Sequence, residues 1–176
     1  MNTLNIQSVK KELPVFTTIL DNHQQLNQYL KEVIFEHRQQ YPETTYSNVK
    51  AWHTEWMTHQ KNPKFQPIVD LVISACEFIS QGYFNQKVEF KCFNMWAMIY
   101  EKGEHAVKHS HYPSDFACAY YVDVEPGCSP IIFEDTLKIY PENGMLVVFP
   151  AMLHHEVPPT DARRIVISMN LDKHYC

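Results

Sequence analysis

The sequence contains no Cys-x-x-Cys pair, no cluster of lysine and arginine, and no apolar run near the length of a membrane span. Its five cysteines are scattered and odd in number, which argues against a disulfide framework and against a thiolate zinc site. Binding of nucleic-acid phosphates needs clustered basic residues, and the formal net charge here is -5, so nucleic acid is not an expected partner. A bilayer span needs ~20 consecutive apolar residues, so no membrane association is expected either.

The first residues also lack the pattern of a secretory signal, because no basic segment leads into an apolar one. Together with unpaired cysteines, this predicts a cytoplasmic protein. Of the 176 residues, 45 % are hydrophobic and 13 % are aromatic, which is enough to form a globular core. No internal repeat or linker divides the sequence, so we expect one domain over residues 1–176.

The first half of this domain, residues 1–85, has the pattern of helices. Apolar residues at helical spacing predict a helix that begins after Asp21 or Asn22, either of which could cap it, and ends before Pro42. A second helix is predicted to begin near Pro67, because proline suits the first turn, and to stop at Gly82.

The second half, residues 86–176, has the pattern of strands. Six short runs rich in β-branched and aromatic residues alternate with breaks, and every break except the single Asn94 contains glycine or proline. The runs cover residues 88–93, 95–100, 116–124, 131–133, 145–149 and 164–171. Several short strands at this spacing are typical of a sandwich or barrel. We therefore predict an α+β fold, in which N-terminal helices pack on a jelly roll, the double-stranded β-helix.

Three histidines indicate a metal site. His109 and His111 are two residues apart, so in an extended segment both side chains point to one face, as two ligands of one ion must. His155 follows the predicted strand 145–149 and could supply a third ligand, whereas His154 points the other way and is expected to be solvated. Neutral imidazole binds Fe(II), Zn(II), Cu(II) and Ni(II), so this pattern alone leaves the metal open.

Nine residues after His155, Arg164 begins the last predicted strand. Alternation places four side chains on one face of that strand: Arg164, Val166, Ser168 and Asn170. Burying a lone charge is costly, so an inward-facing Arg164 needs a carboxylate, which a guanidinium can bind through two parallel hydrogen bonds. The carboxylate could belong to Glu156 or to a bound anion, whereas Arg163 faces the other way and is expected to be exposed.

The sequence resembles the 2-oxoglutarate/Fe(II)-dependent oxygenases with a jelly-roll core, because several short segments agree with that family in the same order. This family is distantly similar to prolyl hydroxylases. The sequence is most similar to a branch with a His-x-His pair followed by a strand of the Ser-Gly-x-Tyr-Tyr type. The segments that carry the resemblance are residues 47–52, 96–99, 109–111, 117–122, 132–135, 144–150, 153–157 and 164–170. The sequence departs from that branch at Ala117-Cys118, where Ser-Gly is usual, and at Met98, where Asn is usual.

The resemblance implies that His109 and His155 bind Fe(II) and that Arg164 holds the far carboxylate of 2-oxoglutarate. Ser168 or a tyrosine such as Tyr120 could assist Arg164. In the wider superfamily the second residue of the pair is Asp or Glu, completing a two-histidine, one-carboxylate triad. Here that position is His111, and the alternatives are that Asp115 or Asp135 supplies the carboxylate, or that water takes the third place.

The implied activity is hydroxylation of a peptide or small-molecule substrate with O2, releasing succinate and CO2. Two other functions are compatible with the three histidines. One is a cupin-like metal- or ligand-binding module without turnover, and the other is a three-histidine dioxygenase that needs no 2-oxoglutarate. Arg164 argues against the second of these, because that reaction needs no group to hold a co-substrate.

Overall fold

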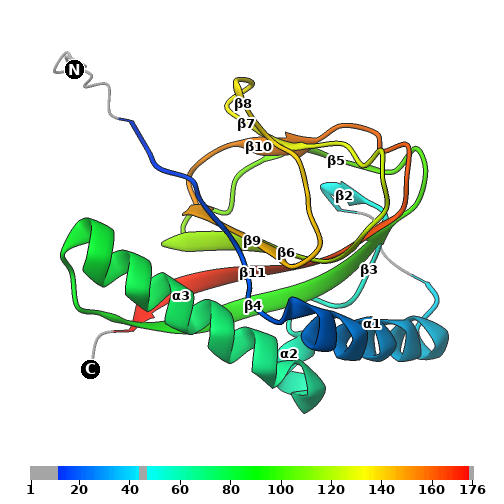
Figure 1. Ribbon diagram of the computed structural model, residues 1–176, viewed down its shortest axis with the longest axis horizontal. Helices are drawn as coiled ribbons and strands as arrows, with labels where there is room; N and C mark the ends of the chain where they lie inside the picture. The colour runs from blue at the N-terminus through cyan, green and yellow to red at the C-terminus, as the bar shows by residue number, and fades with distance from the viewer. Residues whose placement is uncertain (1–11, 44–46, 175–176) are drawn as a thin grey trace, which may run out of the picture.

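The computed structural model describes residues 12–43 and 47–174, and its centre is formed by two antiparallel β-sheets (Figure 1). The larger sheet has six strands in the order β1 (Phe16–Ile19), β9 (Met145–Pro150), β6 (Phe116–Val124), β11 (Arg164–His174), β4 (Glu89–Tyr100) and β3 (Trp52–His53). The smaller sheet has five, in the order β2 (Val49–Lys50), β5 (His105–His109), β10 (His155–Val157), β7 (Ile131–Phe133) and β8 (Leu137–Ile139). From β4 onward the chain passes back and forth between the sheets, except at the β7–β8 hairpin.

The helices cover the outer face of the larger sheet (Figure 1). They are α1 (His23–Gln40), the short α2 (Thr58–Lys61), a 3-10 turn (Pro63–Phe65) and α3 (Gln66–Phe84). Each long helix buries one stripe of apolar side chains against the sheet, and in α1 this stripe includes Leu30, Val33 and Ile34. No helix in the described ranges is long and apolar enough to cross a bilayer. The α+β class predicted from the sequence is confirmed.

The helix ends differ slightly from their predicted positions. Asn22 occupies the N-cap of α1, but its backbone is left-handed and its side chain makes no capping hydrogen bond. Helix α3 continues past Gly82 and ends at Asn85, whose left-handed backbone (φ 53°) closes the last turn through a hydrogen bond to the Ser80 carbonyl. Asparagine adopts this conformation more readily than other residues with a side chain, so it ends the helix where glycine was expected to.

The strands also differ from the predicted pattern. The runs 88–93 and 95–100 form the single strand β4, because Asn94 pairs with Asn170 while Cys92 pairs with Leu171, which leaves Phe93 as an extra residue in a bulge. The first half is not wholly helical, since it contains β1, β2 and β3. These strands have two to four residues, too few for periodicity, and they depend on distant partners such as β9 for β1.

Two apolar cores lie on opposite faces of the larger sheet, and the central strand β11 contributes to both. Ile165, Ile167 and Met169 pack against the helices, and Val166 packs between the sheets. Fully burying an aliphatic side chain of this size contributes about 1.5–3 kcal/mol. The helix-facing side of β11 therefore stabilises the fold, while its other side is free to carry polar groups.

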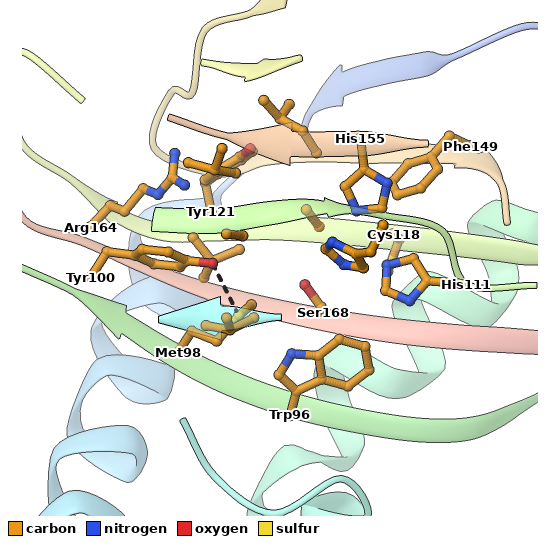
Figure 2. A pocket seen from close by; sticks show the side chains of 17 residues that line it. Trp96, Met98, Tyr100, His111, Cys118, Tyr121, Phe149, His155, Arg164 and Ser168 are labelled. Carbon is orange, nitrogen blue, oxygen red and sulfur yellow. Dashed lines mark hydrogen bonds between the residues drawn. The ribbon is translucent and has the colours of Figure 1, made fainter. Parts of the chain in front are cut away.

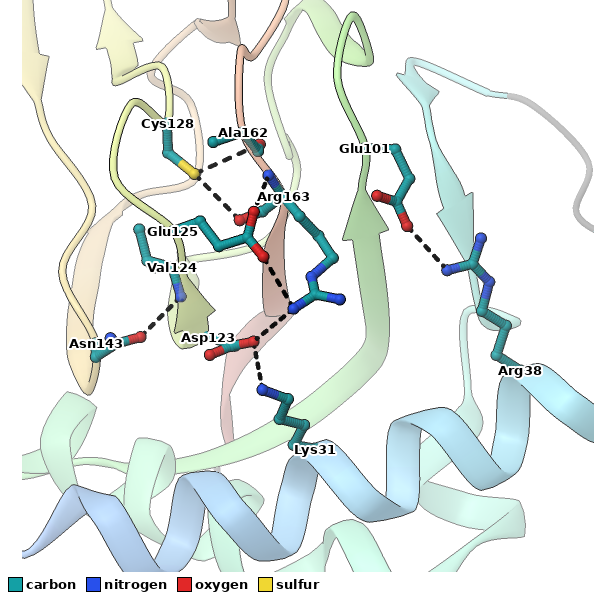
Figure 3. A network of polar contacts seen from close by, with 10 residues as sticks. All are labelled: Lys31, Arg38, Glu101, Asp123, Val124, Glu125, Cys128, Asn143, Ala162 and Arg163. Carbon is teal, nitrogen blue, oxygen red and sulfur yellow. Dashed lines mark hydrogen bonds and ion pairs between the residues drawn. The ribbon is translucent and has the colours of Figure 1, made fainter.

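Helix α1 is also joined to the larger sheet by a chain of charges (Figure 3). Lys31 lies 2.7 Å from Asp123 on β6, and Arg163 reaches Asp123 at 3.6 Å and Glu125 at 3.0 Å. All four side chains are partly exposed, and such pairs contribute only about 0–1 kcal/mol each. Arg163 is thus held at the surface of the sheet, in contrast to its neighbour Arg164.

The turn before β9 is built around Gly144, which has a backbone φ of +78°. Its carbonyl accepts a hydrogen bond from the backbone N–H of Leu20 at 3.0 Å, at the junction between β1 and α1. A Cβ atom at this position would lie 2.2 Å from Cγ of His23. Both the backbone conformation and the contact therefore require glycine.

We predict that Gly144→Ala destabilises the protein more than Gly103→Ala. Gly103 has a similar φ of +87°, but a Cβ atom added there would meet no other atom within 4 Å, so its substitution costs only the backbone strain of about 1–2 kcal/mol. Gly144→Ala adds a steric cost of about 1–3 kcal/mol against His23. Urea denaturation of the two variants measures the difference, and equal losses would contradict the close packing of this turn.

Candidate metal centre

Three imidazole rings meet at one end of the space between the sheets (Figure 2). One ligand nitrogen from each of His109, His111 and His155 lies within 4.8 Å of the other two. The ring centroids of His109 and His155 are 4.5 Å apart, and that of His111 lies 5.0 Å from each. These distances group the three rings as a set that could hold one metal ion.

The smaller sheet sets the positions of these rings. His109 ends β5 and His155 begins β10, and the two residues are direct partners across the antiparallel pair. His111 follows β5, and its backbone N–H donates to the Ala151 carbonyl at 2.7 Å, which fixes this segment against the turn before β10. Residues far apart in sequence are thus brought to one point by strand pairing.

Hydrogen bonds to backbone carbonyls orient two of the rings. Nδ1 of His109 lies 2.7 Å from the Val107 carbonyl, and Nδ1 of His155 lies 3.2 Å from the Leu153 carbonyl. A carbonyl oxygen can only accept, so Nδ1 must carry the proton in both rings. The lone pair is then on Nε2, as is usual when an imidazole binds a metal.

The environment keeps all three imidazoles neutral. Burial lowers the pKa of His111 to about 3, and the nearby His155 and His109 contribute to this lowering. Burial likewise lowers the pKa of His155 to about 3, with His109 as the next cause. The pKa of His109 is lowered by burial too, against the hydrogen bond to Val107. Metal ligation requires unprotonated imidazole, so these rings are prepared for a cation.

The other candidate ligands lie elsewhere. Asp115 accepts a hydrogen bond from the Lys173 backbone N–H at 2.8 Å, and Asp135 pairs with Lys108. His154 precedes β10 and is exposed, with its Nδ1 3.6 Å from the Glu134 carboxylate. Across residues 12–43 and 47–174, no carboxylate belongs to the group that could hold an ion.

Arg164 lies at the opposite end of the same space (Figure 2). It is only 2 % exposed, and its guanidinium carbon is 4.5 Å from the centre of the Tyr100 ring. One nitrogen donates to the Ser129 carbonyl at 2.8 Å, and Nε has no hydrogen-bond partner. Within the described part of the chain Arg164 forms no ion pair, so Glu156 does not neutralise it.

The two tyrosines of β6 point in opposite directions. Tyr121 lines the space between the sheets with Ser168, whereas the Tyr120 hydroxyl donates to Asn27 of α1 at 2.6 Å on the helical side. Tyr120, which we expected beside Arg164 from the sequence, therefore lies on the other face of the sheet. Its neighbour Tyr121 lies beside Arg164 instead. Adjacent residues of a strand face opposite ways, but only the register of β6 against β11 decides which of them faces inward.

Tyr100 is a second residue beside Arg164 that the sequence did not single out. Burial raises its pKa to about 12, although the Arg164 charge lowers it, and burial raises the pKa of Tyr121 in the same way. Both hydroxyls therefore stay protonated and can donate hydrogen bonds. Tyr100 pairs with Arg164 across β4 and β11, a contact that no local pattern reveals.

Two cavities adjoin the histidines. One of about 40 Å³ runs between the sheets from the histidines to Arg164 and is lined by Met98, Val166 and Ser168 among others. Another of about 320 Å³ opens on the other side of His109 and His111. The metal centre thus lies between a narrow space that ends at a cation and a wider one whose described lining contains no charged side chain.

Comparison with known proteins shows similarity in structure rather than in sequence. No protein-family model matches the chain, and no curated protein matches it. The structure is similar to a prolyl-4-hydroxylase of Pseudomonas putida, with 15 % identity over 92 % of this chain and 93 % of that one and a TM-score of 0.66. It is also similar to HygX of Streptomyces hygroscopicus, solved with nickel and 2-oxoglutarate bound, with 7 % identity over 93 % and 83 % of the chains and a TM-score of 0.65.

A third similar structure is the viral collagen prolyl hydroxylase of Paramecium bursaria Chlorella virus-1 in complex with 2-oxoglutarate. It shares 15 % identity over 89 % of this chain and 94 % of that one, with a TM-score of 0.60. The fold of this chain is therefore that of the prolyl hydroxylases and other 2-oxoglutarate/Fe(II) oxygenases.

We predict that the protein binds one divalent ion through the three histidines. Outer hydrogen-bond partners of metal ligands are typically worth 10–100-fold in affinity, so removing a ligand in His155→Ala should weaken binding by about 100-fold or more. Anaerobic equilibrium dialysis against Fe(II) measures it. His154→Ala is the matched control, and an equal loss in that variant would show that the metal is bound elsewhere.

We further predict that Tyr120→Phe affects stability and not the metal centre. It leaves the side-chain oxygen of Asn27, a buried residue, without its hydrogen bond, which costs about 1–3 kcal/mol. Thermal unfolding should show the loss, while the affinity for Fe(II) stays within about twofold. A large drop in metal affinity with unchanged stability would place Tyr120 in the site.

Proposed function

We propose that the protein is an Fe(II)- and 2-oxoglutarate-dependent oxygenase, with residues 1–176 forming one domain around a double-stranded β-helix. It would hydroxylate a peptide or small-molecule substrate with O2 and release succinate and CO2. The observation that carries the proposal is Arg164, a buried guanidinium without a protein carboxylate that lines the same cavity as three neutral imidazoles.

Arg164 fits the far carboxylate of a dicarboxylic acid. Guanidinium binds carboxylate through parallel N–H···O bonds, and an uncompensated buried charge is costly, so an anion at this place would remove a cost present in the free protein. The rings of Tyr100 and Tyr121 lie beside it, with their centres 4.5 Å and 6.0 Å from the guanidinium carbon, and their protonated hydroxyls are further donors in the same cavity. Ser168, two positions beyond Val166 on β11, lines the cavity nearer the histidines.

The three histidines fit Fe(II), since imidazole is a suitable ligand for this ion and each ring is held neutral. Without a carboxylate ligand the protein does not offset the two charges of the metal, whereas 2-oxoglutarate carries two negative charges. The similar structures with bound 2-oxoglutarate support the assignment. Bound iron supplies the activation of O2, which no side chain of the protein can perform.

The described residues then have defined tasks. Arg164, Tyr100 and Tyr121 bind and orient the co-substrate, and Met98 and Val166 exclude water from the space between the sheets. That space has a volume of about 40 Å³, with the three histidines at one end and Arg164 at the other. Met98 is buried among the residues between the sheets, and its sulfur accepts a weak hydrogen bond from the Tyr100 hydroxyl at 3.6 Å.

The absence of a carboxylate among the three ligands also supports a second candidate, a metal-binding module without turnover. Neutral three-histidine sites suit Zn(II), Ni(II) and Cu(II) as well as Fe(II). This candidate does not account for the unpaired Arg164, and neither does a three-histidine dioxygenase that works without a co-substrate.

The test is anaerobic titration of the Fe(II)-loaded protein with 2-oxoglutarate, followed by the visible absorption of the chelate. Truncating one partner of a buried charge pair costs about 2–5 kcal/mol, so Arg164→Met should weaken 2-oxoglutarate binding by roughly 30-fold to 4000-fold. The neighbouring, partly exposed Arg163 supplies the matched control, and Arg163→Met should bind as the wild type does.

Oxygen is then admitted and succinate is measured. Absorption of the chelate with succinate release supports the oxygenase. Tight zinc binding with no response to 2-oxoglutarate would favour the binding module, and oxygen uptake without succinate would favour the three-histidine dioxygenase. Equal 2-oxoglutarate affinity in Arg164→Met and the wild type would remove the observation on which the proposal rests.

A further inference from the structure

The cavity of about 320 Å³ beside His109 and His111 is polar but uncharged. Its described lining contains serine, asparagine, histidine, tryptophan and valine, and no aspartate, glutamate, lysine or arginine. It lies on the side of the histidines away from Arg164, which lines only the narrower cavity. A charged ligand would find no opposite charge in this lining, whereas a neutral polar ligand would find hydrogen-bonding groups.

Two asparagine side chains share the floor of this cavity. Asn94 on β4 and Asn170 on β11 are direct partners across the antiparallel pair, next to the bulge at Phe93. Asn170 lies six residues from Arg164 along one face of β11, with Ser168 between them. One face of β11 thus carries Arg164, the residue proposed to bind the co-substrate, at one end and Asn170, beside Asn94, at the other.

Neither carboxamide has a partner. The Oδ1 atoms of Asn94 and Asn170 are shielded from solvent and accept no hydrogen bond, and in the described ranges neither side chain donates one. Asn170 is 8 % exposed, and the indole N–H of the 3 % exposed Trp96, which lines both cavities, also has no partner. Buried polar groups are nearly always hydrogen-bonded, so unpartnered groups on one cavity wall indicate a missing ligand.

We propose that this cavity binds the reacting substrate through an uncharged amide, taking the oxygenase of the preceding section as the premise. A secondary amide has one N–H donor and one carbonyl acceptor, and each asparagine side chain offers both an acceptor and donors. Turning either carboxamide breaks no hydrogen bond, so the pair can present an oxygen to the substrate N–H and an NH2 to its carbonyl.

The aromatic wall fits the same ligand. Trp56 lies edge-on to Trp96 with centroids 4.8 Å apart, and it is 43 % exposed at the cavity mouth. Ring faces of this kind suit a flat amide. Trp56 and Ser47 also line a further cavity of about 580 Å³, so an elongated ligand could continue outward from the amide pair. A peptide segment and a free carboxamide share this chemistry, and the experiment distinguishes them.

The test uses metal-free, 15N-labelled protein, so it does not depend on iron or 2-oxoglutarate. The side-chain NH2 signals of Asn94 and Asn170 are assigned by their loss in Asn94→Leu and Asn170→Leu. The protein is then titrated with N-methylacetamide and with methyl acetate, an ester of the same shape without the N–H. The side-chain NH2 signal of Gln66 is the internal control, because Gln66 lines neither cavity and its NH2 already donates to the Asp70 carboxylate at 2.7 Å.

We expect saturable shifts of the Asn94 and Asn170 NH2 signals with the amide, about tenfold or more weaker binding of the ester, and an unchanged Gln66 signal. Each Leu variant should lose the preference for amide over ester. Tighter binding of N-acetyl-Ala-Ala-Ala-N-methylamide than of N-methylacetamide would identify a peptide, and equal or weaker binding a small free amide.

Equal affinity for amide and ester, or no shift of either NH2 signal, would overturn the proposal, and this comparison on the wild type needs no variant to fold. The two proposals fail separately. If the chelate with iron and 2-oxoglutarate does not form but the amide preference persists, the oxygenase is wrong and the amide site remains. If the chelate forms without amide preference, only the amide site is wrong.

Discussion

The side chains of strand β11 alternate between the two faces of the larger sheet, so the same strand contributes to the apolar core and to the candidate site. Ile165, Ile167 and Met169 point to the helices and complete one core, while the residues between them face the space between the sheets. Because β11 is hydrogen-bonded to β4 and β6 along nearly its whole length, neither face can turn without breaking both ladders. The polar face is therefore held as rigidly as the apolar core behind it.

The charge distribution across the space between the two sheets is the second constraint. Arg164 is buried without a carboxylate, and His109, His111 and His155 are kept neutral by burial and by one another. The free protein thus carries unpaired hydrogen-bond donors at one end of a narrow space and unprotonated nitrogens at the other. A ligand that is anionic at both ends, together with a metal ion, would neutralise this arrangement, since each charge would gain an opposite partner where water is excluded.

Local patterns predicted the elements that have enough length to show a period. The helix after Asn22, the strand at 116–124 and the alternation from Arg164 onward all lie where the sequence placed them. Strands β1, β2 and β3 could not be predicted, because their two to four residues become strands only by pairing with distant partners. The bulge at Phe93 was misread as a break for the same reason, since an extra residue interrupts the alternation without ending the strand.

By itself, the sequence determined which chemistry is available: three histidines for a metal, an arginine nine residues beyond the last of them, and no charge pattern for nucleic acid. Tertiary structure alone decided where these residues lie relative to one another. Strand register brought His111 rather than Asp115 or Asp135 to His109 and His155, and turned Tyr121 rather than Tyr120 toward Arg164. Neighbouring side chains in a strand point to opposite faces, and this follows from the sequence. Which face points inward depends on pairing with residues far along the chain.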